Sequence, residues 1–510
     1  MPSADHRHRV RQDFLDLPLD RLSDSALQRC RDFGAEHADV RIELLTEQAL
    51  SLRDGVVEGS HDGRILGLAV RVLIDGTWGF AATSRLSTDS AVRAAEQAVR
   101  VAQVSAPLAT EHVQLADEPV HADATWVSAY EQDPAAVPTV DKVELFAGWS
   151  AGLLRAAPVR HVEVSYSHAI ENKHYADLAG TTTTQQRVRM HPVVTVHGAD
   201  EERNLIDTMR TLAPPVARGW EYVGEPVTGG WDWSSELAQL PELLAAKLAA
   251  PSVQPGQYDL VIDPSNLWLT IHESVGHATE LDRALGYEAN YAGTSFATWD
   301  QLGSLQYGSP AMTVTGDRTI EHGLSTIGYD DEGVQAQTWD LVRDGVFVGY
   351  QTDRSMAARQ GLGRSTGCAF ADSPGHIPIQ RMANVSLQPA ADGPDTDALL
   401  GGVDDGIYVL GDRSWSIDMQ RFNFQFTGQR FYRIRNGRLD GQLRDVAYQA
   451  TTTDFWRSLE AVGGPQTWVL GGAFNCGKAQ PGQVAPVSHG CPSALFRSVR
   501  ILNTRTEGGR

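Results

Sequence analysis

Hydrophobic and polar residues alternate along much of the first 200 residues, with the period of two that is typical of β-strands. This alternation predicts strands over residues 38–45, 49–53, 65–74 and 77–82, and again within 159–198. Asp75 and Gly76 form a good hairpin turn between two of these strands. Apolar residues recur at helical spacing over 23–34, 90–106 and 140–157. We therefore expect the first half to be α/β, with antiparallel strands and flanking helices.

The pattern changes near residue 225. Residues 236–250 predict a helix that Pro251 ends, and we interpret this stretch as a connector. Beyond it the pattern predicts mostly short strands, over 258–262, 312–315, 339–342, 346–350, 407–409, 422–426 and 431–434. We expect an α+β protein made of an N-terminal α/β domain, a connector helix and a β-rich C-terminal domain, at residues 1–225, 226–255 and 256–510.

Composition and charge narrow the class of protein. The 510 residues are too many for one ordinary core, and 42% hydrophobic with 21% charged residues is typical of a soluble protein. The net charge of -21 disfavours nucleic acid and anionic membrane as partners. No run of about 18 apolar residues predicts a membrane span, and the polar N-terminus lacks the apolar core of a signal peptide, so we expect a cytoplasmic location.

The candidate chemistry lies in the sequence HESVGH at residues 272–277, which holds His272, Glu273 and His277. Neutral imidazole is the commonest transition-metal ligand, and a carboxylate beside a metal-bound water is the usual base for hydrolysis. Asp263 and Pro264 suit the N-cap and first position of a helix, which places the motif two turns into that helix. A zinc peptidase centre is the interpretation that these residue types favour.

The spacing of the two histidines requires a distorted helix. In the common HExxH zinc motif they are four residues apart and share one helix face. Here they are five apart, and on a regular helix they would diverge by roughly 140°. A π-bulge would reduce this divergence to roughly 50°, and Gly276 is where that distortion is easiest.

A catalytic zinc needs three protein ligands and one open position, so a third ligand must come from elsewhere. Cys476 is the best candidate, because it lies in a glycine-rich stretch beside Lys478, which could favour the thiolate. A buried apolar thiol is an equally good interpretation of Cys476. The rival ligands are His489, Cys491, Glu280, Asp282 and Glu288.

Two further signals are weak. Asp330, Asp331, Glu332 and Gly333 could bind calcium, but such a run is more often an acidic turn. Asn384-Val385-Ser386 fits a glycosylation sequon, which has no consequence inside the cell.

Taken together, the motifs resemble those of the TldD/PmbA family of metalloproteases. The resemblance rests on the motif at 272–277, followed in the family's order by residues 293–295, 329–333, 402–408 and 476–478. The segment 488–492 departs from the family pattern, since it carries His489 and Cys491. The chain keeps the His-Glu motif and so resembles the active, TldD-type subunits.

The resemblance implies His272, His277 and Cys476 as ligands of one Zn2+ per active subunit, and Glu273 as the catalytic carboxylate. It also implies a dimer that encloses the site, with a second copy or a motif-less relative as partner, and unfolded or extended peptides as substrates. We therefore expect a zinc-dependent metallopeptidase. The alternatives are a non-catalytic peptide-binding scaffold with a structural metal and a metal hydrolase of small amides.

Overall fold

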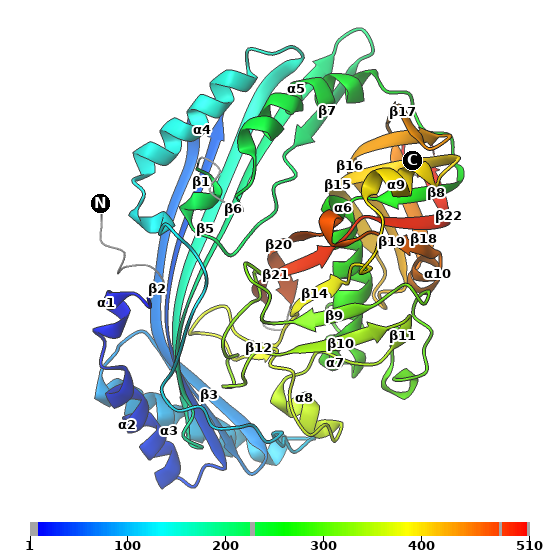
Figure 1. Ribbon diagram of the computed structural model, residues 1–510. Helices are drawn as coiled ribbons and strands as arrows, with labels where there is room; N and C mark the ends of the chain where they lie inside the picture. The colour runs from blue at the N-terminus through cyan, green and yellow to red at the C-terminus, as the bar shows by residue number, and fades with distance from the viewer. Residues whose placement is uncertain (1–8, 225–229, 479–481, 507–510) are drawn as a thin grey trace.

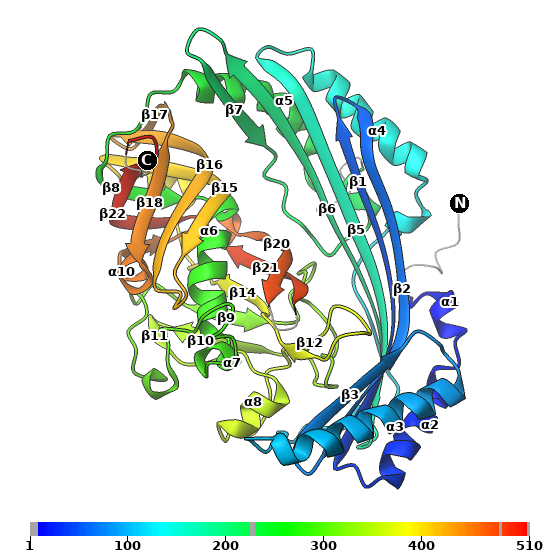
Figure 2. The same ribbon diagram turned by 180° about the vertical axis from the view of Figure 1, so that it is seen from behind.

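The computed structural model describes residues 9–224, 230–478 and 482–506. A long curved sheet built from the first half of the chain arches around the C-terminal half (Figures 1 and 2). The fold is α+β, as the hydrophobic pattern predicts. The expected boundary between residues 225 and 226 lies outside the described residues, and the domain limits stay a prediction.

The first sheet has seven strands in the order β3-β2-β1-β5-β6-β4, with β7 paired to β6. All its pairings are antiparallel except that of β4 with β6. The two short strands predicted over 38–45 and 49–53 are one strand, because pairing to β2 and β5 continues through the polar residues between them. The strands are β1 (His37–Arg53), β2 (Val56–Ile74), β3 (Thr77–Thr83), β4 (Ala124–Val127), β5 (Val159–Asp177), β6 (Thr182–Asp200) and β7 (Leu205–Arg210).

Helices cover the outer face of this sheet in two groups, each with its own apolar core (Figure 1). Alanines and leucines of α2 and α3 pack on β1 and β2, and apolar residues of α4 and α5 pack on β5 and β6. The predicted helix at 236–250 begins at Trp233, whose ring is buried in the second of these cores. The helices are α1 (Gln12–Leu15), α2 (Leu19–Asp32), α3 (Thr88–Ser105), α4 (Thr139–Leu153) and α5 (Trp233–Ala249).

A second seven-stranded sheet forms the core of the C-terminal half, in the order β15-β8-β22-β18-β16-β17, with β19 on β22. Because β15 also pairs with β16, the sheet closes on itself. The segments predicted over 422–426 and 431–434 are parts of one strand, and Phe424 and Phe426 lie buried on its inner face. The strands are β8 (Gly256–Ile262), β15 (Asp405–Ile417), β16 (Asn423–Arg435), β17 (Arg438–Leu443), β18 (Val446–Thr451), β19 (Leu459–Val462) and β22 (Ala494–Asn503).

Three smaller sheets lie beside this core: β11-β10-β9-β14, the pair β12-β13, and the pair β20-β21. Their strands are β9 (Val314–Asp317), β10 (Thr338–Arg343), β11 (Val346–Phe347), β12 (Ala369–Phe370), β13 (Ile379–Gln380), β14 (Asn384–Leu387), β20 (Val469–Lys478) and β21 (Gln483–Cys491). The helices of this half are α6 (Pro264–Ile271), α7 (Leu281–Ala284), α8 (Arg354–Arg359), α9 (Thr396–Gly401) and α10 (Thr452–Arg457). None of the described helices is both long and apolar enough to span a bilayer.

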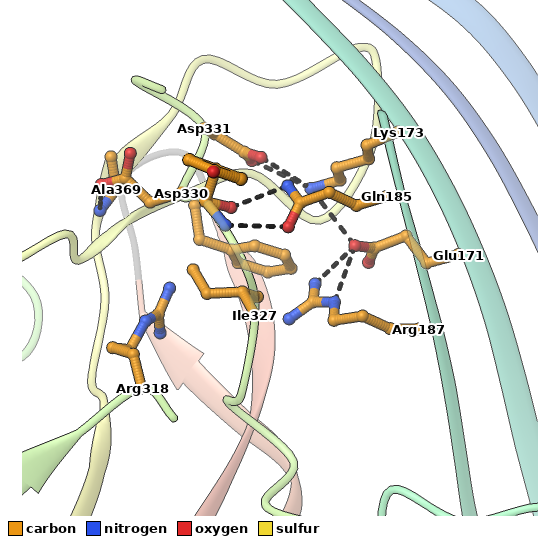
Figure 3. A pocket seen from close by; sticks show the side chains of 11 residues that line it. Glu171, Lys173, Gln185, Arg187, Arg318, Ile327, Asp330, Asp331 and Ala369 are labelled. Atoms are coloured by element: carbon orange, nitrogen blue, oxygen red, sulfur yellow. Dashed lines mark hydrogen bonds and ion pairs between the residues drawn. The ribbon is translucent and has the colours of Figure 1, made fainter. Parts of the chain in front are cut away.

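A buried network of charges joins the two halves (Figure 3). Lys173 on β5 donates to the Asp331 carboxylate (2.9 Å) and to Ala371 O (2.8 Å), and the Gln185 side chain on β6 accepts from the backbone N–H of Tyr329. The cavity among these side chains encloses about 10 Å³, which is space for about one water. The acidic run at 330–333 is therefore a turn that docks the C-terminal half onto the first sheet.

Candidate metal centre

The histidine motif lies on the two irregular turns that directly follow α6. The helix begins as predicted, because the Asp263 carboxylate accepts from Ser265 N (2.9 Å) and Pro264 occupies the first position. It runs into a π-helical turn, η4 (His272–Gly276), and then a 3-10 turn, η5 (His277–Thr279). The predicted widening of the helix is thus confirmed, and it brings the two imidazole ring centroids within 4.7 Å of each other.

Side chains satisfy the backbone carbonyls that these irregular turns leave without regular helical partners. Thr279 Oγ1 donates to Val275 O (2.9 Å), and Gln351 Nε2 donates to Gly276 O (2.7 Å). A Cβ at Gly276 would lie 2.5 Å from Sδ of Met382, so a larger residue would displace that side chain. One local and one distant side chain therefore stabilise a turn that is unfavourable in an isolated helix.

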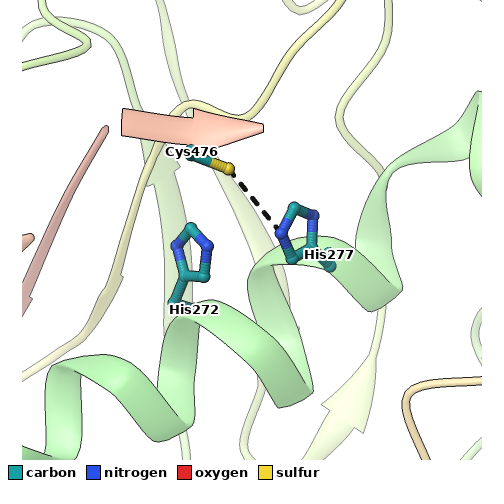
Figure 4. Close-up of side chains that lie close together, drawn as sticks. All are labelled: His272, His277 and Cys476. Carbon is teal, nitrogen blue, oxygen red and sulfur yellow. Dashed lines mark hydrogen bonds between the residues drawn. The ribbon is translucent and has the colours of Figure 1, made fainter. Parts of the chain in front are cut away.

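Strand β20 brings a third donor atom to the two histidines. The Sγ of Cys476 lies 3.7 Å from Nε2 of His277, and the donor atoms of all three residues lie within 4.8 Å of one another (Figure 4). Around a tetrahedral zinc, bonds of about 2.0 Å to nitrogen and 2.3 Å to sulfur place the two ligand atoms about 3.5 Å apart. The distance between the donor atoms of His277 and Cys476 therefore fits a zinc ion, and His272 lies close enough to complete the group.

Each histidine has one ring nitrogen engaged outside the group of three. Nδ1 of His277 lies 2.8 Å from the Glu280 carboxylate, and Nδ1 of His272 lies 2.7 Å from Nε2 of His489. Each ring thus has its Nε2 to offer to an ion. Burial lowers the pKa of both His272 and His277, which favours the neutral imidazole that a metal requires.

The Cys476 thiol is also biased towards the ligand form. Burial alone would raise its pKa, but His277 and Arg381 outweigh this effect, so the pKa lies below its ordinary value. Lys478, which we expected to favour the thiolate, instead donates to Asp282 (2.8 Å) and Glu280 (3.3 Å). Lys478 therefore pairs with these carboxylates, and the groups that lower the pKa of Cys476 are His277 and Arg381.

The carboxylate of Glu273 forms a buried ion pair with Arg421. The Nη1 of Arg421 donates to Oε2 of Glu273 at 2.6 Å, and their side chains are 14% and 7% exposed. Arg421 lies in the turn between β15 and β16 with a φ of +63°. Thr294 N donates to Met419 O in the same turn (2.8 Å), so the segment at 293–295 holds the turn in place.

The rival ligands lie outside the group of three donor atoms. Cys491 donates to Pro264 O, and burial raises the pKa of its thiol well above the ordinary value. Glu280 contacts the far side of His277, and Asp282 binds Lys478. In the described part of the chain, the one group of three or more such side chains close enough to share an ion is His272, His277 and Cys476.

Comparison with family models identifies the family of this chain. A family model described as the PmbA/TldA metallopeptidase C-terminal domain matches residues 255–503, and the model of domain 1 of the same family matches residues 38–102. The chain belongs to this metallopeptidase family. The resemblance found in the motifs is therefore confirmed, and the two matches together span more than half of the chain.

Individual family members are similar over almost their whole length. The chain is 28% identical over 478 residues to a metalloprotease of Methanothermobacter thermautotrophicus, covering 92% of this chain and 96% of that one. It is 21% identical over 488 residues to a zinc metalloprotease TldD homologue of Saccharolobus solfataricus, covering 93% and 98%.

Solved structures share the fold at low identity. A Thermotoga maritima protein described as a modulator of DNA gyrase matches with a TM-score of 0.74 at 16% identity, covering 95% of this chain and all of that one. TldE from Thermococcus kodakarensis matches with a TM-score of 0.69 at 14% identity, covering 94% and 99%.

The sequence alone did not reveal which side chains contact the two histidines and Glu273. Glu280 was weighed as a ligand, although its position three residues after His277 on a helical stretch is a signal for a direct side-chain contact. Arg421 has no sequence signal, since its partner Glu273 lies 148 positions away. His489 was weighed as a rival ligand rather than as a partner of His272.

Proposed function

We propose that the chain is a zinc-dependent metallopeptidase that hydrolyses peptide bonds in unfolded or extended peptides in the cytoplasm. In this proposal His272, His277 and Cys476 hold one zinc ion, and Glu273 is the catalytic carboxylate. The observation that carries it is the convergence of three buried donor atoms within 4.8 Å on a widened helical turn that also bears Glu273. The four cysteines are all unpaired, which supports a reducing compartment.

Each side chain then has a defined task. His272, His277 and Cys476 would hold a zinc ion, which would polarise the scissile carbonyl and lower the pKa of a water towards about 7. Glu273 accepts the proton of the attacking water and passes it to the leaving amine. Glu280 orients the ring of His277 through Nδ1, and Arg421 holds one oxygen of the Glu273 carboxylate.

A cavity of about 480 Å³ between the two halves supports an extended substrate. It lies beside Trp268, whose ring stacks on His489, and beside β20, the strand that bears Cys476. Among the described strands β20 pairs only with β21, and in this proposal a peptide adds main-chain hydrogen bonds along its other edge, before the Cys476 carbonyl that Arg381 binds. Residues that line the cavity include Trp231, Trp268, Trp415, Gly471, Gly472 and Ala473.

We also propose that the active form is a dimer, either of two copies or with a relative that lacks the metal motif. The fold likeness to TldE supports a family pairing of this kind. Native mass spectrometry of the purified chain tests the first form. A chain that is monomeric alone and active as a monomer contradicts the proposal.

The test is a digest of an unstructured peptide by the wild type and by Glu273→Gln. We expect the variant to keep its zinc and to lose activity by about 10²–10⁴-fold, because general base catalysis contributes that much. Glu58→Gln, at an exposed position of β2, is the matched control and keeps full activity. A Glu273→Gln protein that cleaves peptides at the wild-type rate refutes the role of Glu273.

The same assay separates the alternatives. A structural metal needs a closed site, and the described residues bring three donors together rather than four. Loss of peptide cleavage with chelator and its return with zinc supports the peptidase. A zinc-loaded protein that cleaves small amides but no unstructured peptide supports the small-amide hydrolase.

A further inference from the structure

Two short segments that are far apart in the sequence interlock beside His272. Residues 384–386 of β14 face residues 488–490 of β21, and each position of one segment contacts the matching position of the other. The Asn384 side chain accepts from Ser488 N (3.2 Å), Val385 O lies 2.8 Å from Nδ1 of His489, and Ser386 Oγ accepts from Gly490 N (2.9 Å). This interlock includes the Asn-Val-Ser run and the His489 segment to which the proposed chemistry gives no task.

The interlock leaves His489 a single orientation. Its ring is fully buried, stacks on Trp268 with 6.2 Å between centroids, and lies 2.7 Å from Nδ1 of His272 through its own Nε2. Backbone pairing of β21 with β20, the strand of Cys476, holds His489 opposite Gly471. The ring therefore has fixed partners at both nitrogens and on one face.

The direction of each hydrogen bond follows from the chemistry of the partners. A backbone carbonyl can only accept, so Nδ1 of His489 carries the hydrogen that Val385 O receives. A neutral imidazole has one N–H, so Nε2 of His489 accepts, and the hydrogen of the His489–His272 contact is on Nδ1 of His272. His272 is left with a bare lone pair on Nε2, the form in which an imidazole binds a metal.

We propose that His489 is a positioning residue that fixes the tautomer and the ring orientation of His272. The hydrogen bond from Nδ1 of His489 to Val385 O makes Nε2 of His489 an acceptor, and this acceptor holds the hydrogen of His272 on Nδ1. The proposal rests on the proposed function, because it assigns a metal to Nε2 of His272. His277 receives the equivalent support from the Glu280 carboxylate, so the two histidines are held by chemically different partners. Loss of such an outer partner typically weakens metal binding by 10–100-fold.

The test compares zinc affinity, measured by competition with a chromophoric chelator, in a matched pair of variants. His489→Gln places an amide oxygen near the position of Nε2 and keeps an acceptor for His272. His489→Asn keeps a donor near Nδ1 for Val385 O but has no atom that reaches His272. We expect the Asn variant to bind zinc 10–100-fold more weakly than the wild type, and the Gln variant to recover most of that loss.

Cys491→Ala is the control, because Cys491 lies two residues along β21, is buried like His489, and contacts Pro264 instead of the histidines. We expect it to bind zinc as the wild type does. A second readout is the ¹⁵N spectrum of the metal-free protein, in which His272 carries its proton on Nδ1 in the wild type and exchanges between both nitrogens in the Asn variant.

The outcomes separate this inference from the proposed function. An Asn variant that binds zinc within twofold of the wild type, or Gln and Asn variants that are equally weak, overturns the role of His489 and leaves the peptidase intact. A wild-type protein that binds no zinc at the three donors overturns the proposed function and this role together.

Discussion

The ion pair between Arg421 and Glu273 permits a quantitative test that needs no metal. Arg421→Met removes the positive charge and keeps a side chain of similar reach. Glu273 would then be a carboxylate whose side chain is 7% exposed and that has lost its partner at 2.6 Å. Glu273→Gln creates the opposite case, a buried guanidinium whose Nε already has no hydrogen-bond partner in the described structure.

Removing one partner of a buried ion pair costs about 3–5 kcal/mol, whereas replacing both with neutral groups is often close to neutral. We therefore expect each single variant to lose about 3 kcal/mol of unfolding free energy. The double variant loses about as much as one single variant or less. The coupling energy is then at least about 3 kcal/mol, far above the roughly 0.5 kcal/mol error of additivity.

The assay is urea unfolding of the chelator-treated wild type, both single variants and the double variant. Arg433→Met is the control, because Arg433 pairs with the exposed Asp405 on the same hairpin and its loss costs less than about 1 kcal/mol. In the zinc-loaded enzyme, Arg421→Met lowers kcat by about 10²-fold, since a carboxylate misplaced by about 1 Å costs this much. Additive losses, with no coupling, refute the reasoning.

Three further predictions concern the frame around the centre. Lys173→Met removes the cation that hydrogen-bonds the buried Asp331 carboxylate at 2.9 Å and leaves Arg41, at 3.5 Å, as its cation. We expect this variant to lower the unfolding free energy by about 3 kcal/mol; a loss below about 1 kcal/mol contradicts this. Gly293→Ala places a Cβ 1.9 Å from Met419 O, at a φ of +84°. Its control is Gly303→Ala, where φ is +79° and no atom lies near the added Cβ. We expect the first variant to lower the melting temperature more than the second, and equal shifts contradict the clash. Burial, with Lys142 nearby, lowers the pKa of His168 to about 3. Below about pH 6.5 the unfolded chain therefore binds a proton at His168 that the folded protein does not bind. The unfolding free energy falls by up to about 1.4 kcal/mol per pH unit between about pH 6.5 and pH 3. Acid unfolding curves of His168→Gln show a smaller slope.

The sequence contains enough information to predict the widened turn. Five-residue spacing of His272 and His277 is incompatible with a regular helix, and Gly276 marks where the distortion is easiest. Local signals of this kind need no knowledge of distant residues. The helix start at Asp263 was predictable for the same reason, since a cap acts within one turn.

Contacts between distant segments were not predictable from local pattern. Cys476 and His489 lie on adjacent strands, β20 and β21, and both approach the histidines, so sequence alone left them as competing ligands. The structure separates them by position, because Cys476 Sγ joins the donor group and His489 lies behind His272. The long strand β1 was predicted as two pieces because the polar residues 46–48 interrupt its apolar pattern, whereas its backbone pairing to β2 and β5 continues through them.

Anomalous diffraction at the zinc edge, from crystals grown with zinc, tests the central claim most directly. The account predicts one peak per chain, bonded to Nε2 of His272, Nε2 of His277 and Sγ of Cys476, with a fourth position that no protein atom fills. A peak bonded to Cys491 or to Glu280, or the absence of any peak at the three donors, would contradict it.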